Sequence, residues 1–139
     1  MRMEKTLLIV KPDATGRSLT GEILRRLEGA GFRLCAIRAL RLRREEAESF
    51  YLVHRERPFY AELVAYMTSG PVVPMVLERE NAVAALREFI GATNPADAKK
   101  GSIRSDLGLD VQRNAVHASD SIESARREIA FFFAERERL

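Results

Sequence analysis

The sequence predicts an α+β fold in which a four-stranded antiparallel sheet is covered by helices. Two observations support this class. Apolar runs of strand length alternate with segments of helical periodicity, and one long stretch before the last strand shows no periodicity. The 139 residues suit a single domain spanning 1–139, and a content of 46% hydrophobic and 31% charged residues is typical of a globular protein.

Strand and helix patterns alternate through the first half of the chain. The apolar run 6–10 predicts an interior strand, and apolar residues at helical spacing after Gly21 predict an amphipathic helix. A second strand is expected over residues 32–42, and two short helices are expected over residues 45–54 and 59–67.

The second half of the chain supplies the remaining elements. Residues 72–77 predict a strand despite Pro74, which lacks the N–H that an interior ladder uses. Asn81 is expected to cap a helix that ends at Ile90. Residues 91–113 show no periodicity but carry apolar anchors, so they predict a packed functional loop.

A short fourth strand around Val116 and a helix that runs to Phe133 complete the chain. Asp120 is expected to cap this helix, with Glu123 completing a capping box. The resulting order is β-α-β-β-α-β with a long loop before the last strand. This is the ferredoxin-like arrangement, an antiparallel sheet with helices on one face.

One histidine stands where phosphate chemistry is favoured. His117 follows the fourth strand and faces the start of the last helix, whose free N–H groups and dipole stabilise anionic oxygens. An imidazole is a nucleophile or base that works near neutral pH. On spacing alone, a histidine near a helix start is more often structural. The other histidine, His54, has no motif around it and is expected to be structural.

Charge and composition limit the function classes. A net charge of +3 suits phosphate-bearing ligands of any size. The arginines lie among glutamates, as over residues 41–46, and such mixed runs are usually solvated helix faces. The lone Cys35 excludes an intrachain disulfide, and the apolar runs are too short to cross a bilayer. We therefore expect a cytoplasmic protein.

Several other functions have weak support in the sequence. An RNA-binding module of this fold stacks bases on aromatic residues of its central strands, and residues 6–10 and 72–77 contain none. A metal enzyme would need a Cys/His cluster, which does not occur. Neither a Gly-x-Ser-x-Gly elbow nor a Walker-type phosphate loop is present. The RNA-binding module is the best of these alternatives.

A set of motifs supports the hypothesis that His117 takes part in phosphate chemistry. Residues 113–121, R-N-x-V-H-x-S-D-S, resemble the active-site signature of nucleoside diphosphate kinases. Further segments resemble that family in the same order along nearly the whole chain: 6–13, 57–59, 69–73, 91–98, 103–106, 123–125 and 128–129.

The resemblance implies an activity and a set of roles. The γ-phosphoryl group of a nucleoside triphosphate would pass to a nucleoside diphosphate by a ping-pong mechanism through a phosphohistidine at His117, with broad base specificity. Glu128, supported by Ser119, would hold the imidazole in one tautomer, and Lys11 would assist. The resemblance implies nucleotide binding by these residues: Lys11, Tyr51, Phe59, Leu63, Arg87, Thr93, Arg104, Val111 and Asn114.

The resemblance also implies a cofactor and partners. Mg²⁺ would be held mainly by the nucleotide's own phosphates, with Asp120 acting through water. The partners would be nucleoside di- and triphosphates and further copies of the chain, in a tetramer or hexamer built from dimers. Neither a membrane nor nucleic acid would be required.

A few residues depart from the family pattern. Ala118 stands directly after the histidine, where glycine is usual, so slight backbone strain is expected there. Pro74 and, in the long loop, Lys100, Ser102, Ser105 and Leu107 also differ from the usual residues. None of these changes removes a group with an implied chemical role.

Overall fold

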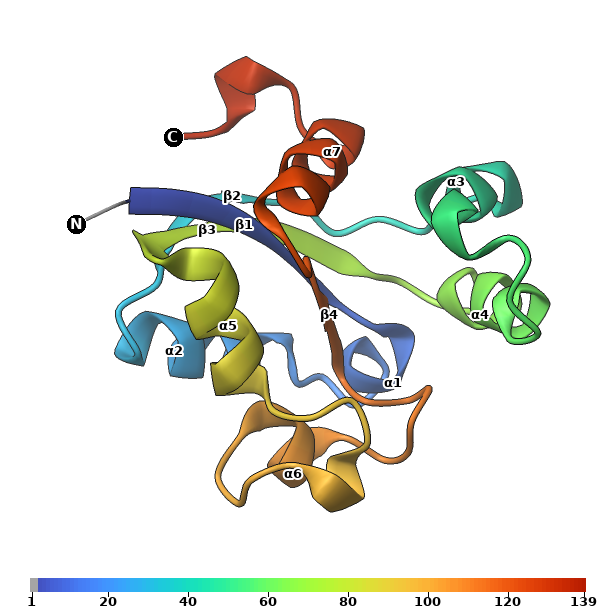
Figure 1. Cartoon of the computed structure of the whole chain (residues 1–139), viewed down its shortest axis with the longest axis horizontal. Helices are drawn as coiled ribbons and strands as arrows, with labels where there is room; N and C mark the ends of the chain where they lie inside the picture. The colour runs from blue at the N-terminus through green and yellow to red at the C-terminus, as the bar shows by residue number, and fades with distance from the viewer. Residues whose placement is uncertain (1–2) are drawn as a thin grey trace.

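The computed structural model describes residues 3–139 and contains a four-stranded sheet of order β2-β3-β1-β4. Every neighbouring pair of strands is antiparallel, as predicted (Figure 1). The strands are β1 (Met3–Val10), β2 (Arg33–Ile37), β3 (Val73–Glu80) and β4 (Val116–Ala118). The helices are α1 (Pro12–Thr15), α2 (Thr20–Gly29), α3 (Arg44–Phe50), α4 (Tyr60–Met67), α5 (Ala82–Ile90), α6 (Ile103–Leu107) and α7 (Ile122–Phe132).

Helices cover both faces of the sheet, so the prediction of helices on one face is wrong. In β1, Leu8 packs in a cluster with residues of α2 and α5, whereas Leu7 packs in a second cluster with residues of α3, α4 and α7. Figure 1 shows α2 and α5 below the sheet and α7 above it. Burial on both sides explains why β1 is apolar without alternation. It also leaves the central strands no open face on which bases could stack.

The interior proline of β3 has a simple structural explanation. The C=O of Pro74 accepts a hydrogen bond from Arg38 N–H at 3.2 Å, just after β2 ends at Ile37. In an antiparallel ladder, the N–H and C=O of one residue face the same neighbouring strand. The missing N–H of Pro74 therefore faces the point where β2 has ended. The second strand is accordingly shorter than predicted, although one bridge between Leu40 and Val72 continues the pairing.

Two predicted helix caps differ in the structure. Asn81 is the N-cap residue of α5, as predicted, but it adopts a left-handed conformation (φ 54°) and makes no side-chain cap, while Glu4 Oε1 accepts a hydrogen bond from Val83 N–H of α5 at 3.3 Å. At the start of α7, Ser121 rather than Asp120 is the N-cap, because its hydroxyl accepts from Ser124 N–H at 3.0 Å.

The long segment before β4 is ordered by short helices. It contains the 3₁₀ turn Pro95–Asp97 and α6, and the hydroxyl of Ser102 caps α6 by accepting from Ser105 N–H at 3.3 Å. Gly91 has φ +94°, and a Cβ there would lie 2.5 Å from Ser102 Oγ. Glycine is therefore required at the point where this packed loop begins.

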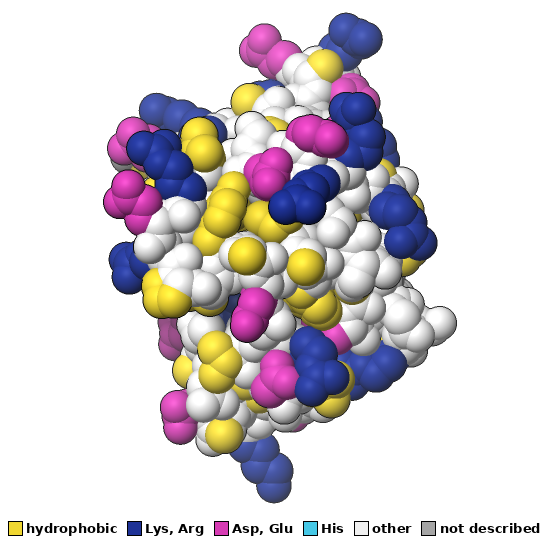
Figure 2. Space-filling model, turned by 90° about the vertical axis from the view of Figure 1, so that its right-hand side faces the viewer, with side chains coloured by type: hydrophobic (Ala, Val, Ile, Leu, Met, Phe, Trp, Pro, Cys, Tyr) yellow, Lys and Arg dark blue, Asp and Glu magenta, His cyan; other side chains and the backbone are white. Residues whose placement is uncertain are grey.

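The surface over α3 and α4 mixes charges of both signs. Figure 2 looks onto this side, and basic, acidic and hydrophobic side chains are interspersed there. At the start of α3, Arg43, the N-cap residue, lies 3.4 Å from Glu46, and Arg44 lies 3.3 Å from Glu48. This is the solvated helix face that the sequence predicted. Among residues 3–139, no helix has both the length and the apolar character needed to span a bilayer.

Candidate functional site

The strand pairing brings the key side chains together at one end of the sheet. Lys11 directly follows β1, and His117 lies in β4, where its backbone pairs with Ile9. The imidazole packs edge-on against the ring of Phe50 at 5.5 Å and of Tyr51 at 6.0 Å between centroids. Aromatic walls of this kind restrict the orientation of the imidazole.

The carboxylate of Glu128 fixes the imidazole from the last helix. Oε1 of Glu128 lies 2.9 Å from His117 Nε2, and Ser119 donates a hydrogen bond to the same oxygen at 2.7 Å. Burial alone would raise the pKa of Glu128, but these two contacts and the positive charge of Arg127 hold it below its ordinary value. An ionised Glu128 accepts a hydrogen bond from Nε2–H, which leaves Nδ1 as the nitrogen available to a ligand.

Two buried cations lie beside the imidazole. Lys11 and Arg104 are each only 7% exposed. Burial and repulsion by Arg104 lower the pKa of Lys11 to about 8, and burial and repulsion by Arg87 lower the pKa of Arg104 to about 10. Cations that repel one another in a low-dielectric site are stabilised by a bound anion. The site is thus prepared for a ligand with several negative charges.

Hydrogen bonds tie these cations to the strand that carries His117. Arg104 Nη2 donates to the C=O of Val116 at 2.8 Å, and Arg87 Nη1 donates to the C=O of Ala118 at 3.2 Å. Lys11 Nζ donates to Asn114 Oδ1 at 2.9 Å. The two arginines therefore bind the residues that flank His117, and Lys11 binds a residue three positions before it.

A cavity of about 430 Å³ contains this cluster. Every residue that the resemblance assigned to nucleotide binding lines it, and so do His117, Glu128 and Asp120. Ser119 does not line the cavity; it is fully buried, and its hydroxyl is linked to the cavity by its hydrogen bond to Glu128. Phe59 is 45% exposed and Val111 is 56% exposed. These two apolar side chains are therefore open to solvent, unlike the apolar residues of the core.

Some residues that line the cavity were not predicted from the sequence, and His54 is the most informative of them. It lines the cavity together with Val53, Ser124 and Arg127. Its ring stacks on Tyr51 at 6.5 Å and lies 5.5 Å from the ring of Phe59. The spacing of three residues from Tyr51 was a usable signal, because a 3₁₀ turn places residues i and i+3 on the same side.

The backbone strain near the histidine is not where it was expected. Ala118 lies in β4, paired with Leu8, and is not among the residues with positive φ. Ala115 instead has φ +75°, three residues earlier. Alanine is therefore accommodated after the histidine because the chain there is an ordinary strand.

The described side chains do not form a metal-binding site by themselves. Within residues 3–139, no group of three His, Cys, Asp or Glu side chains is arranged to hold a metal ion. Asp120 is the carboxylate of the cavity that is not bonded to His117, and a side-chain hydrogen bond with Ser124 lowers its pKa. A cation at this site would need ligands from the bound molecule.

An imidazole oriented by a carboxylate, in one cavity with two buried cations and the exposed Arg87, is typical of a site for phosphoryl transfer by covalent catalysis. The comparisons with known proteins specify the family. The family model described as nucleoside diphosphate kinase matches residues 4–138, and the chain belongs to the nucleoside diphosphate kinase family.

Relatives and solved structures agree over almost the full chain. A nucleoside diphosphate kinase of Rhodospirillum centenum is 60% identical over 134 residues, covering 96% of each chain. One from Desulfatibacillum aliphaticivorans is 54% identical over 135 residues, covering 97% of this chain and 98% of its own. The crystal structure of the Aquifex aeolicus enzyme matches with a TM-score of 0.96 and 49% identity, over 99% of this chain and 100% of that one.

These findings establish the activity. The protein is an enzyme that transfers the γ-phosphoryl group of a nucleoside triphosphate to a nucleoside diphosphate, by the ping-pong phosphohistidine mechanism that is general in its family. Its substrates are nucleotides, and the family requires a divalent cation.

Proposed function

We propose that His117 is the histidine that carries the phosphoryl group and that Nδ1 is the attacking atom. The observation that carries this assignment is the 2.9 Å contact between Nε2 and Glu128, which occupies the other ring nitrogen. The lone pair of Nδ1 forms a bond to the γ-phosphorus, and the bond from that phosphorus to the bridging oxygen breaks. The electron pair leaves with the nucleoside diphosphate, and a second diphosphate reverses the sequence.

The cations would neutralise charge on the transferred group. Arg87, Arg104 and Lys11 line the same cavity as His117, and phosphoryl transfer depends mainly on such positioning and charge stabilisation. Thr93 lines the cavity as well, and its C=O accepts a hydrogen bond from Asn114 Nδ2 at 2.9 Å. We assign the phosphates to the arginines and Thr93, and the sugar hydroxyls and the transferred group to Lys11 and Asn114.

The base would lie against the apolar side chains of the cavity. Phe59 presents an exposed ring, and Val111 and Leu63 also line the site. Tyr51 forms a wall next to the imidazole, and burial raises the pKa of its hydroxyl far above its ordinary value, so the group stays neutral. Contact through ring faces accepts any base, which is consistent with broad specificity.

We assign Mg²⁺ to the substrate rather than to the protein. The cation would enter on the nucleotide's phosphates, which supply the oxygen ligands that Mg²⁺ prefers. Asp120, an exposed carboxylate of the cavity, would bind a water of its hydration shell. The scarcity of carboxylate donors near the described site supports this assignment.

We further propose that the chain forms a homo-oligomer, a tetramer or hexamer built from dimers, and that it works in the cytoplasm. β2 is an edge strand, and Ile37 at its end is 43% exposed, so an edge is available for pairing. The buried free thiol of Cys35 is compatible with a reducing compartment. Light scattering on the purified protein measures the first property, and fractionation of the source cells measures the second.

Labelled ATP tests the assignment of the nucleophile. The parent enzyme, incubated with ATP labelled at the γ-phosphate, should retain acid-labile label. His117→Ala should lose both the label and turnover, yet still bind ADP through the remaining cavity residues. His54→Ala is the matched control, because it removes the only other histidine and lines the same cavity. Label that persists in His117→Ala would place the nucleophile elsewhere.

A further inference from the structure

A strained turn precedes the strand that carries the histidine. Val116 N–H donates to the C=O of Asn114 at 2.9 Å, and the residue between them, Ala115, has φ +75°. A hydrogen bond between residues i and i+2 with this φ is the γ-turn, a rare conformation that is strained for any residue except glycine. Holding such a conformation costs about 1–3 kcal/mol, so neighbouring contacts must stabilise it.

Those contacts come from the segment after β1. The carboxylate of Asp13 is only 2% exposed, and its Oδ2 accepts a hydrogen bond from Ala115 N–H at 3.0 Å. On the other side of the turn residue, the C=O of Ala115 accepts from Lys11 N–H at 2.9 Å. The peptide groups on both sides of Ala115 are thus bound by residues two positions apart in the chain.

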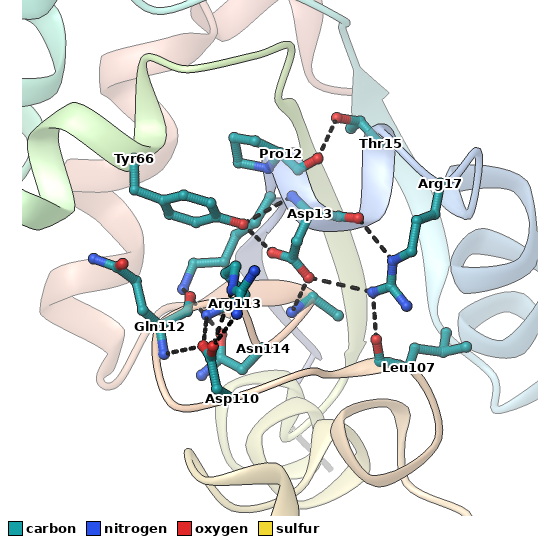
Figure 3. A network of polar contacts seen from close by, with 12 residues as sticks. Pro12, Asp13, Thr15, Arg17, Tyr66, Leu107, Asp110, Gln112, Arg113 and Asn114 are labelled. Atoms are coloured by element: carbon teal, nitrogen blue, oxygen red, sulfur yellow. Dashed lines mark hydrogen bonds and ion pairs between the residues drawn. The ribbon is translucent and has the colours of Figure 1, made fainter.

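Asp13 is itself held in place. The hydroxyl of Tyr66 donates to Asp13 Oδ1 and accepts from Asp13 N–H at 2.8 Å. Arg17 lies 3.4 Å from Oδ2 and also donates to the C=O of Leu107, at the end of α6 (Figure 3). The same carboxylate is therefore linked both to the strand of His117 and, through Arg17, to the helix of Arg104. Neither Asp13 nor Tyr66 lines the nucleotide cavity.

We propose that Asp13, clamped by Tyr66, is a positioning residue for phosphoryl transfer, because its carboxylate holds Ala115 in the γ-turn and so fixes His117 relative to Lys11. Without the carboxylate, Ala115 relaxes to a negative φ and rotates the peptide that begins β4. His117 is two residues further on, and a displacement of about 1 Å lowers the rate of a positioned reaction by about 100-fold. This proposal rests on the proposed role of His117 and deepens it.

Substitutions at Asp13 and Ala115 test the proposal. Asp13→Ala removes the acceptor and should slow phosphoenzyme formation about 10- to 100-fold at saturating ATP. ADP affinity should stay near the parent value, since Phe59, Arg87 and Thr93 come from other elements. Asp13→Asn keeps an oxygen that can accept the Ala115 N–H, so it should retain most of the rate. Ala115→Gly in the Asp13→Ala background should restore the rate, because glycine adopts positive φ without strain.

Tyr66→Phe provides a second test that does not alter Asp13. It should slow phosphoenzyme formation, whereas Tyr60→Phe should not, although Tyr60 lies on the same helix and loses a comparable hydrogen bond to the C=O of Glu48 at 3.0 Å. A parent-like rate in folded Asp13→Ala, or no recovery on adding Ala115→Gly, overturns the proposal. So does an equal loss in Tyr66→Phe and Tyr60→Phe. Failure of the proposed nucleophile is distinguishable, because it shows as label on the His117→Ala enzyme.

Discussion

The carboxylate of Glu128 in α7 lies 2.9 Å from His117 Nε2 in β4, so the last helix determines which nitrogen of the imidazole stays free. Glu128→Gln removes the negative charge, and its amide can donate to Nε2 and stabilise the wrong tautomer. We expect phosphoenzyme formation to slow about 10- to 100-fold, as for other residues that orient a functional imidazole. Rapid-quench kinetics measures this rate. Ser119→Ala, which removes only the second bond to Glu128, should have a smaller effect.

Lys11 should impose an alkaline limit on substrate capture. Burial and repulsion by Arg104 lower its pKa to about 8 in the free enzyme, so the ammonium is charged below this pH and neutral above it. Under the role proposed for Lys11, the nucleotide binds to the charged form, so kcat/KM should fall up to about tenfold for each pH unit above 8. The Lys11→Arg variant keeps its charge and should lack this limb of the profile. An identical profile in both enzymes would assign the limb to another group.

The lowered pKa of Lys11 should also affect folding stability, which should rise with pH where kcat/KM falls. In the unfolded chain the Lys11 ammonium has its ordinary pKa of 10.5, so between about pH 8 and 10.5 the unfolded state binds more protons than the native state. The contribution of Lys11 to the free energy of unfolding should therefore rise with pH across this range. Urea unfolding of the parent and of Lys11→Met, compared at about pH 7.5 and pH 10, isolates this contribution.

The sequence predicts the order of the elements well and their tertiary partners poorly. Periodicity located the strands and helices because burial patterns are local, as in the apolar run of β1. Periodicity could not show that Glu4 would accept a hydrogen bond from Val83 N–H in the first turn of α5, because these residues are 79 positions apart. The covering of both faces was missed for the same reason, since nothing local to α7 identifies the face on which it packs.

The candidate site was predicted from its motifs, and its supporting contacts were not. All residues that the signature implied for the nucleotide line one cavity, which position-by-position resemblance can anticipate. Asp13 is the last residue of the motif at residues 6–13. Its contact with Tyr66, however, joins residues 53 positions apart and depends on the packing of α4. The strain at Ala115 was equally hidden, because alanine gives no sequence signal of a positive φ.

A buried hydroxyl in β1 offers a stability prediction away from the site. Thr6 is fully buried, and its Oγ1 has no hydrogen-bond partner within the described residues. Thr6→Val replaces the unsatisfied hydroxyl by a methyl group of similar shape and should stabilise the protein by about 1 kcal/mol, with activity unchanged. Thr15→Val is the control, because Thr15 donates to the C=O of Pro71 at 2.7 Å and its loss should destabilise. Urea unfolding compares the two.

Arg104→Ala should affect both chemistry and the loop. The guanidinium donates to the C=O groups of Gly91 and Val116, so its removal leaves one part-buried and one buried acceptor without this donor. We expect phosphoryl transfer to fall about 10²- to 10³-fold, as when a preorganised charge-stabilising donor is removed. We also expect a lower melting temperature. Added guanidinium ion should recover part of the rate if the charge acts on the phosphates. Unchanged activity at saturating substrate would make Arg104 a purely structural residue.

The exposed ring of Phe59 should contribute to nucleotide affinity without discriminating between bases. Stacking on an aromatic ring contributes about 1–3 kcal/mol and tolerates every base, whereas a hydrogen-bonding pocket discriminates by about 10⁴ or more. Purine and pyrimidine diphosphates should therefore have kcat/KM values within about two orders of magnitude of one another.

Substitution of the ring separates stacking from other contributions. Phe59→Ala should weaken the binding of all nucleoside diphosphates by about 1–3 kcal/mol, with a small change in the rate of transfer at saturation. Phe59→Tyr preserves the ring face and serves as the matched control. Titration calorimetry with ADP, GDP, CDP and UDP measures these affinities. A preference of about 10⁴ for one base, or a loss in Phe59→Ala confined to one base, would show that the base edge is recognised by hydrogen bonds instead.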